Sequence, residues 1–126
     1  MLSKIIKVLA YLTSLLLLGM GLRWLIDPAG AAAELGMPLL EGLGRSTQIG
    51  DLTAFFVGGS CLGLAGLIRN DAKLLYAPIL LVGLAAVFRT LAWLLHDAAL
   101  APQIVPEIIM CAIFILAARQ MSKGTG

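Results

Sequence analysis

The segment "LLVGLAAVFRTLAWLLHD" at residues 80–97 combines a long apolar run with one guanidinium group, that of Arg89. An apolar stretch of this length with a single charge in its interior is a candidate membrane-spanning helix. A charge near the centre of such a helix costs about 2.5–3.5 kcal/mol on insertion scales, so it normally has a partner inside the protein. The segment therefore predicts both a membrane helix and a polar contact within the membrane.

The composition of the whole chain supports the same environment. Of its 126 residues, 60% are hydrophobic and 13% are charged, whereas soluble domains average about 45–50% and 25%. The length allows one domain, residues 1–126. The formal net charge is +2, and no basic cluster with interleaved aromatics is present, so a nucleic-acid partner is excluded and the lipid bilayer is the expected solvent.

Four segments are long and apolar enough to cross a hydrocarbon core about 30 Å thick, which takes roughly 20 helical residues. They cover about residues 5–26, 52–68, 74–95 and 102–118. We therefore expect an all-α membrane protein with four transmembrane helices in a bundle. The stretch "DPAGAAAELGMP" (residues 27–38) predicts a short amphipathic helix in the outer loop between the first and second, with Asp27 as N-cap and Pro28 at its first position.

The basic residues predict the orientation. The leucine-rich start with Lys4 and Lys7 resembles a secretory signal, but its apolar run is longer than a typical signal core, so we expect a retained helix. Positive residues outside the membrane stay on the cytoplasmic side. We therefore expect a multi-pass protein of a bacterial inner membrane with both termini cytoplasmic. The cytoplasmic side would hold Lys4, Lys7, Arg69, Lys73, Arg119 and Lys123, against Arg23 and Arg45 outside.

Small residues and cysteines lie inside the apolar runs. The second span has small residues at helical spacing, which allow close approach of backbones and predict a central helix; they are Ala54, Gly58, Gly59, Gly63 and Gly66. Cys61 and Cys111 fit packing residues, with a disulfide or redox role left open. No His and Cys grouping has zinc spacing, so neither a metal nor another cofactor is expected.

Two opposite charges share one depth in this topology. Arg89 and Glu107 each lie about six residues, roughly 9 Å, inside the outer end of their helices. Because intramembrane charges normally face the bundle interior and pair, we expect an Arg89–Glu107 ion pair. Further polar residues reach the outer half of the membrane, and together they predict an outward-facing cavity that is lined by Arg89, Glu107, Asp51, Arg23, Trp93 and His96.

The same residues also have purely structural explanations. The Arg89–Glu107 pair can serve only to fix the order of the helices, and Glu107 can simply favour the positive end of its helix dipole. Arg23 and Asp51 can act as interface anchors, and His96 with Asp97 can form a turn. Trp24 and Trp93 can be aromatic belt residues.

The chain resembles the DoxX-like group of small four-helix bacterial membrane proteins, which includes families known only as domains of unknown function. The resembling stretches are "EGLGRSTQIGD" with Glu41 and Arg45, "FRTLAWLLHDA" with Arg89, and "PEIIM" with Glu107. The resemblance implies a four-helix fold and adds Glu41 and Arg45 to the candidate ligand-binding residues. It implies little about activity.

Three functions are compatible with these features. The first is a non-catalytic membrane protein whose pocket binds a small amphipathic molecule or lipid, with Arg89 as clamp, or which forms a homo-oligomer or acts as an accessory subunit of a larger membrane complex. The second is an intramembrane enzyme, such as a lipid isomerase, that moves protons with Glu107 and either His96 or Asp51. The third is a small multidrug-type exporter, which is disfavoured because the first span holds no carboxylate.

Overall fold

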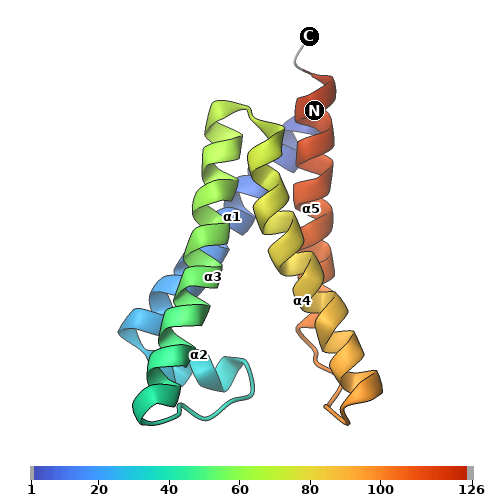
Figure 1. The fold of residues 1–126 in the computed structure, drawn as a ribbon. Coiled ribbons are helices and arrows are strands. Elements are labelled where there is room, and N and C mark those ends of the chain that lie inside the picture. Colours follow the sequence, from blue (N-terminus) through green and yellow to red (C-terminus); the bar gives the residue numbers. More distant parts are fainter. Residues whose placement is uncertain (1, 125–126) are drawn as a thin grey trace.

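The computed structural model describes residues 2–124, and over these residues it is helical without a strand. Figure 1 shows the elements in chain order: α1 (Leu2–Ile26), α2 (Pro28–Glu34), α3 (Gly42–Arg69), the 3-10 helix η1 (Ala72–Leu75), α4 (Tyr76–Leu95) and α5 (Ile104–Lys123). Four helical segments are long and apolar enough to cross a membrane, namely α1, α3, η1 with α4, and α5. By length and composition the chain is a multi-pass membrane protein, as the sequence predicts.

The long helices form two antiparallel pairs. Helix α1 packs along α3, and α4 packs along α5. The pairs meet at the end of the molecule that holds both termini and η1, and they diverge toward the other end, where α2 and residues 96–103 lie (Figure 1). These are called here the terminal end and the splayed end.

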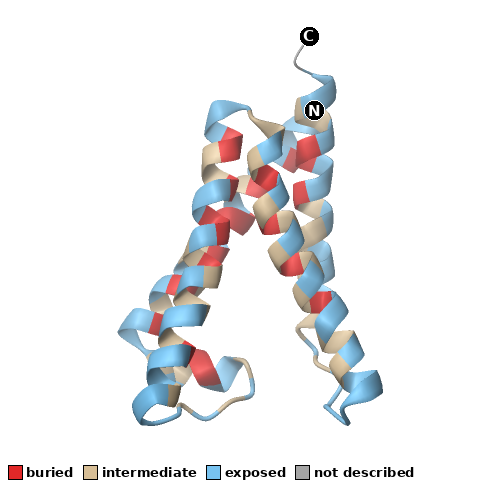
Figure 2. Cartoon of the chain, viewed as in Figure 1, coloured by how far each residue is buried: buried red, intermediate tan, exposed pale blue. Residues whose placement is uncertain are grey.

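Buried residues concentrate where the two pairs meet (Figure 2). At the terminal end Leu67, Leu75 and Phe114 are almost completely inaccessible to solvent. Glycine lets α1 and α3 approach closely, because a Cβ atom on Gly63 would lie 2.9 Å from the hydroxyl oxygen of Ser14. Of the small residues that predict a central helix, Gly59, Gly63 and Gly66 are buried, whereas Ala54 and Gly58 are exposed.

Helix α3 begins ten residues earlier than the hydropathy predicts. It has 28 residues and is therefore about 42 Å long, which exceeds a hydrocarbon core of about 30 Å. The first turns of α3 are helical but polar, so a span estimated from hydropathy omits them. Gln48 in these turns is buried, and its amide binds the preceding loop by accepting from the Leu40 nitrogen (2.8 Å) and donating to the Pro38 carbonyl (3.1 Å).

The short helix α2 follows α1 directly. The Asp27 side chain caps it by accepting a hydrogen bond from the Gly30 nitrogen (3.2 Å), and Pro28 occupies its first turn. Ala32 on α2 is buried, as is Trp24 near the end of α1. Trp24, 1% exposed, is therefore a core residue and not a membrane-interface residue.

Candidate functional site: an ion pair beside an apolar cavity

Arg89 on α4 and Glu107 on α5 form the ion pair that their common depth predicts. The Arg89 Nε atom lies 3.0 Å from Glu107 Oε1 and donates a hydrogen bond to Oε2 at 3.2 Å. The side chains are 30% and 12% exposed, respectively. The antiparallel packing of α4 and α5 brings the two residues opposite each other, so the guanidinium on the apolar helix α4 is neutralised within the protein.

The pair leaves hydrogen-bonding atoms unused. Glu107 Oε1 is buried and accepts no hydrogen bond of suitable geometry from the described residues, although Nε is near. The terminal amino groups of Arg89 form no hydrogen bond or ion pair with residues 2–124, and its one hydrogen bond comes from Nε. A buried acceptor and free guanidinium donors therefore lie next to each other, and both residues line the same cavity.

That cavity has a volume of about 350 Å³ and lies among the four long helices. Besides Arg89 and Glu107, the polar side chains in its wall are those of Gln103 and Thr13, and the Thr13 hydroxyl already donates to the Leu9 carbonyl (2.7 Å). Most of the remaining wall is apolar; it includes Leu17, Met20, Phe55, Phe56, Val82 and Met110. An ion pair in the wall of an otherwise apolar cavity is typical of a small-molecule site.

A second cavity of about 300 Å³ adjoins the first at the splayed end. The two share four lining residues, Met20, Leu35, Phe56 and Gln103. The second cavity also contacts Arg23 on α1 and Glu34 on α2. The space beside Arg89 therefore continues toward the splayed end and passes next to α2.

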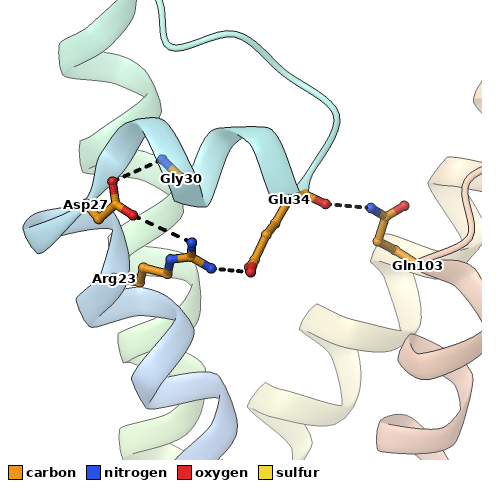
Figure 3. A network of polar contacts seen from close by, with 5 residues as sticks. All are labelled: Arg23, Asp27, Gly30, Glu34 and Gln103. Carbon is orange, nitrogen blue, oxygen red and sulfur yellow. Dashed lines mark hydrogen bonds and ion pairs between the residues drawn. The ribbon is translucent and has the colours of Figure 1, made fainter.

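Arg23 belongs to a separate polar network that positions α2 (Figure 3). Its guanidinium pairs with Glu34 and lies 3.5 Å from Asp27 Oδ2. The Gln103 side chain then donates to the Glu34 carbonyl at 3.1 Å and connects α2 to the beginning of α5. Sequence reasoning did not find the role of Glu34; the available signal was that it is the one carboxylate on the short helix.

Five predicted site residues lie away from the cavity. Asp51 is exposed on α3, and Trp93 and His96 are exposed at and just beyond the end of α4. Arg45 instead donates to the Leu40 carbonyl (2.8 Å), and Glu41 is the exposed N-cap residue of α3.

The courses of α3 and α4 account for two of these positions. Trp93 lies one turn beyond Arg89 on α4, where α4 diverges from α3 (Figure 1), and its side chain is exposed. The predicted second span begins at residue 52, which would put Asp51 at the start of its helix, but α3 already begins at Gly42. Of the predicted set, the structure brings together Arg89 and Glu107, with Arg23 in the adjoining cavity.

Neither a disulfide nor a group of metal-binding side chains is found among residues 2–124. Cys61 is exposed and Cys111 half-buried, and both are free thiols, so they do not form a disulfide. The Cys111 thiol lies 3.6 Å from the Ile79 carbonyl as a weak donor. Within residues 2–124 no group of three or more His, Cys, Asp or Glu side chains is arranged to hold a metal ion.

No protein-family model, curated protein or solved structure matches the chain. The chemistry available to the site follows from its own geometry. Arg89 and Glu107 together can hold a polar group, and the apolar wall offers a surface for a hydrocarbon chain. Proton transfer would need a second titrating group beside Glu107, and the described cavity wall contains neither a histidine nor another carboxyl group.

Proposed function

We propose that this protein binds a small amphipathic molecule or lipid in the cavity beside Arg89 and Glu107. The observation that carries the proposal is the partly buried ion pair with unused hydrogen-bonding atoms, set in the wall of an otherwise apolar cavity. Buried polar atoms are nearly always hydrogen-bonded in folded proteins. A bound head group would supply the missing partners.

The geometry favours one kind of head group. The free amino groups of Arg89 can donate hydrogen bonds to a ligand, and Glu107 Oε1 can accept one from it. Glu107 already neutralises the guanidinium and would repel a multiply charged anion at short range. A neutral head that both accepts and donates, such as a hydroxyl or a protonated carboxyl group, therefore fits better than a phosphate.

Retention of a native molecule tests the proposal. The protein is purified in native-lipid nanodiscs, and its bound small molecules are extracted and identified by mass spectrometry. Arg89→Gln is compared with Arg45→Gln, because Arg45 is an exposed arginine outside the cavity. We expect one amphipathic species with wild type and with Arg45→Gln, depleted roughly tenfold in Arg89→Gln, as loss of about 1.4 kcal/mol would give. Equal retention by the two variants, or no retained species in wild type, contradicts it.

The proposed orientation places the splayed end on the periplasmic side of a bacterial inner membrane and both termini in the cytoplasm. The distribution of basic residues between the two ends supports it. The terminal end carries Lys4, Lys7, Arg69, Lys73, Arg119 and Lys123, and the splayed end Arg23 and Arg45. A fluorescent-protein fusion at the C-terminus should fluoresce, and a periplasm-dependent phosphatase fusion there should stay inactive.

A role as accessory subunit of a membrane complex is a second proposal of the same non-catalytic class. It is supported by the splayed end of α4 and α5, where no residue from 87 to 113 is buried. A partner helix packed there would cross-link to labels on this segment.

The isomerase alternative has less support, because His96 and Asp51 lie outside the cavity that Glu107 lines. Membership of the DoxX-like group stays part of the proposal, supported by the four long helices and the Arg89–Glu107 contact.

A further inference from the structure

An apolar groove runs along the outer surface between α4 and α5. Its wider part has a volume of about 540 Å³ and is lined almost entirely by apolar side chains, among them Leu84, Val87, Ile108 and Ala112. A second hollow of about 330 Å³ continues it toward the terminal end and shares Ile79 and Ile115 with it. The two hollows therefore form one continuous groove.

The groove changes from apolar to cationic at the terminal end. Ile115, Arg119 and Lys123 follow one another at intervals of four residues, so they lie on one face of α5. Tyr76 lies opposite at the start of α4 and is also exposed. A hydrocarbon surface thus ends at two cations and one phenol, which are the side chains typical of a membrane interface.

These two cations are available for an external anion. Neither Arg119 nor Lys123 forms an ion pair with a carboxylate in the part of the chain that the structure describes. Among residues 2–124, Asp71 is the acidic side chain at this end, and its Oδ1 atom accepts from the Lys73 backbone nitrogen at 3.1 Å. The remaining charged side chains at this end are basic: Lys4, Lys7, Arg69 and Lys73.

We propose that the groove binds an anionic phospholipid from the leaflet on the terminal side. One acyl chain lies along Ile115, Ile79 and Ala112, and the phosphate contacts Arg119 and Lys123. From Ile104 to Lys123 the groove follows α5 for about 28 Å, so half of it accommodates the acyl chain of one leaflet. A zwitterionic lipid carries no net charge and gains less from the two cations. Arg89 and Glu107 do not line this groove, so the site is separate from the cavity.

Lipid titration measured by native mass spectrometry tests the headgroup contact. Delipidated protein is titrated with phosphatidylglycerol and with phosphatidylcholine of the same chain length. We expect roughly tenfold tighter binding of one phosphatidylglycerol, and loss of this preference in Arg119→Gln/Lys123→Gln. Lys4→Gln/Lys7→Gln removes the same charge from the same end but outside the groove, and should retain the preference. Equal binding of both lipids, or loss of the preference in both double variants, overturns the proposal.

Two further measurements test the acyl-chain contact. Ala112→Phe fills the apolar groove without a change of charge, because Ala112 is exposed and lines it. We expect this variant to bind phosphatidylglycerol several-fold more weakly, and millimolar inorganic phosphate not to displace the lipid from wild type. Unchanged affinity in Ala112→Phe, or displacement by phosphate, overturns the assignment to a membrane lipid. Because retention in the central cavity depends on Arg89, failure of either proposal is distinguishable from failure of the other.

Discussion

The two arms of the splayed end are built differently. The first arm comprises α2 and the adjacent halves of α1 and α3, and it has a core of its own: Trp24 is 1% exposed, Ala32 is fully buried and Gln48 is 9% exposed. The second arm comprises the adjacent halves of α4 and α5 with residues 96–103 between them. From residue 87 to residue 113 it contains no buried residue. One arm is therefore packed internally, whereas the other is covered mainly by what surrounds it.

This difference explains the position of the charged residues. When lipid is the alternative, apolar contact between helices brings little hydrophobic gain, so polar contacts add to van der Waals packing in holding the second arm. Its two helices are joined by the Arg89–Glu107 ion pair, and Gln103 connects it to the first arm through the Glu34 carbonyl. The cavity lies between the arms and contacts both Arg89 and Gln103. The groups that hold the second arm are thus also groups that a ligand would meet.

The largest expected effect concerns the core of the first arm. Trp24→Ala removes an indole that is 1% exposed and should lower the free energy of unfolding by about 3–5 kcal/mol. Trp93→Ala in the second arm removes an indole that is 45% exposed and should cost less than about 1 kcal/mol. Denaturant unfolding in detergent micelles measures both. Equal losses would show that the two arms are packed alike.

A smaller effect is expected where the arms join the terminal end. Gly63→Ala places a Cβ atom 2.9 Å from Ser14 Oγ, and Ser14 is fully buried, so the helices must separate at a cost of about 1–3 kcal/mol. Gly58→Ala lies on the same helix with nothing within 4 Å and should stabilise it by about 0.5–1 kcal/mol. Thermal unfolding in the same detergent compares them. If Gly63→Ala is as stable as Gly58→Ala, the close approach of α1 and α3 at Gly63 does not contribute to stability.

The ion pair is expected to contribute less than either packing effect. In a double-mutant cycle, Arg89→Gln, Glu107→Gln and the double variant should give a coupling energy of about 1–2 kcal/mol, below that of fully buried pairs because the side chains are 30% and 12% exposed. The double variant should be more stable than Glu107→Gln alone, which leaves the guanidinium unpaired. A coupling energy near zero would mean that another contact joins the helices of the second arm.

Much of this fold is predictable from the sequence because hydropathy reports which segments prefer lipid. All four spans are found where apolar runs occur, and the equal depth of Arg89 and Glu107 predicts their contact. The polar first turns of α3 are not predictable in this way. In these turns the Gln48 side chain is hydrogen-bonded to Pro38 and Leu40 in the preceding loop. Hydropathy does not report such contacts.

The cavity is less predictable, because position along a helix gives depth but not direction around the bundle. Asp51 and His96 lie in the predicted half of the molecule, yet neither faces the cavity. Trp24 is buried because α2 folds back beside it, whereas Trp93 has no such cover. Whether another element covers a side chain decides these outcomes, and that depends on contacts between segments far apart in the sequence, such as Gln103 with Glu34.

The smallest expected effect is therefore the most direct test of the difference between the arms. Gln103→Ala removes the hydrogen bond to the Glu34 carbonyl and should cost only about 0.6 kcal/mol, a typical value for one side-chain hydrogen bond in a membrane protein. It should nevertheless broaden the distribution of distances between two spin labels, as measured by pulsed electron paramagnetic resonance. The labels are placed at Leu43 and Leu95, exposed sites on opposite arms, after Cys61 and Cys111 are replaced. Gln120→Ala, on the same helix at the terminal end, should leave that distance unchanged. If both variants keep the wild-type distance, the second arm is positioned by its junction with the terminal end and not by α2.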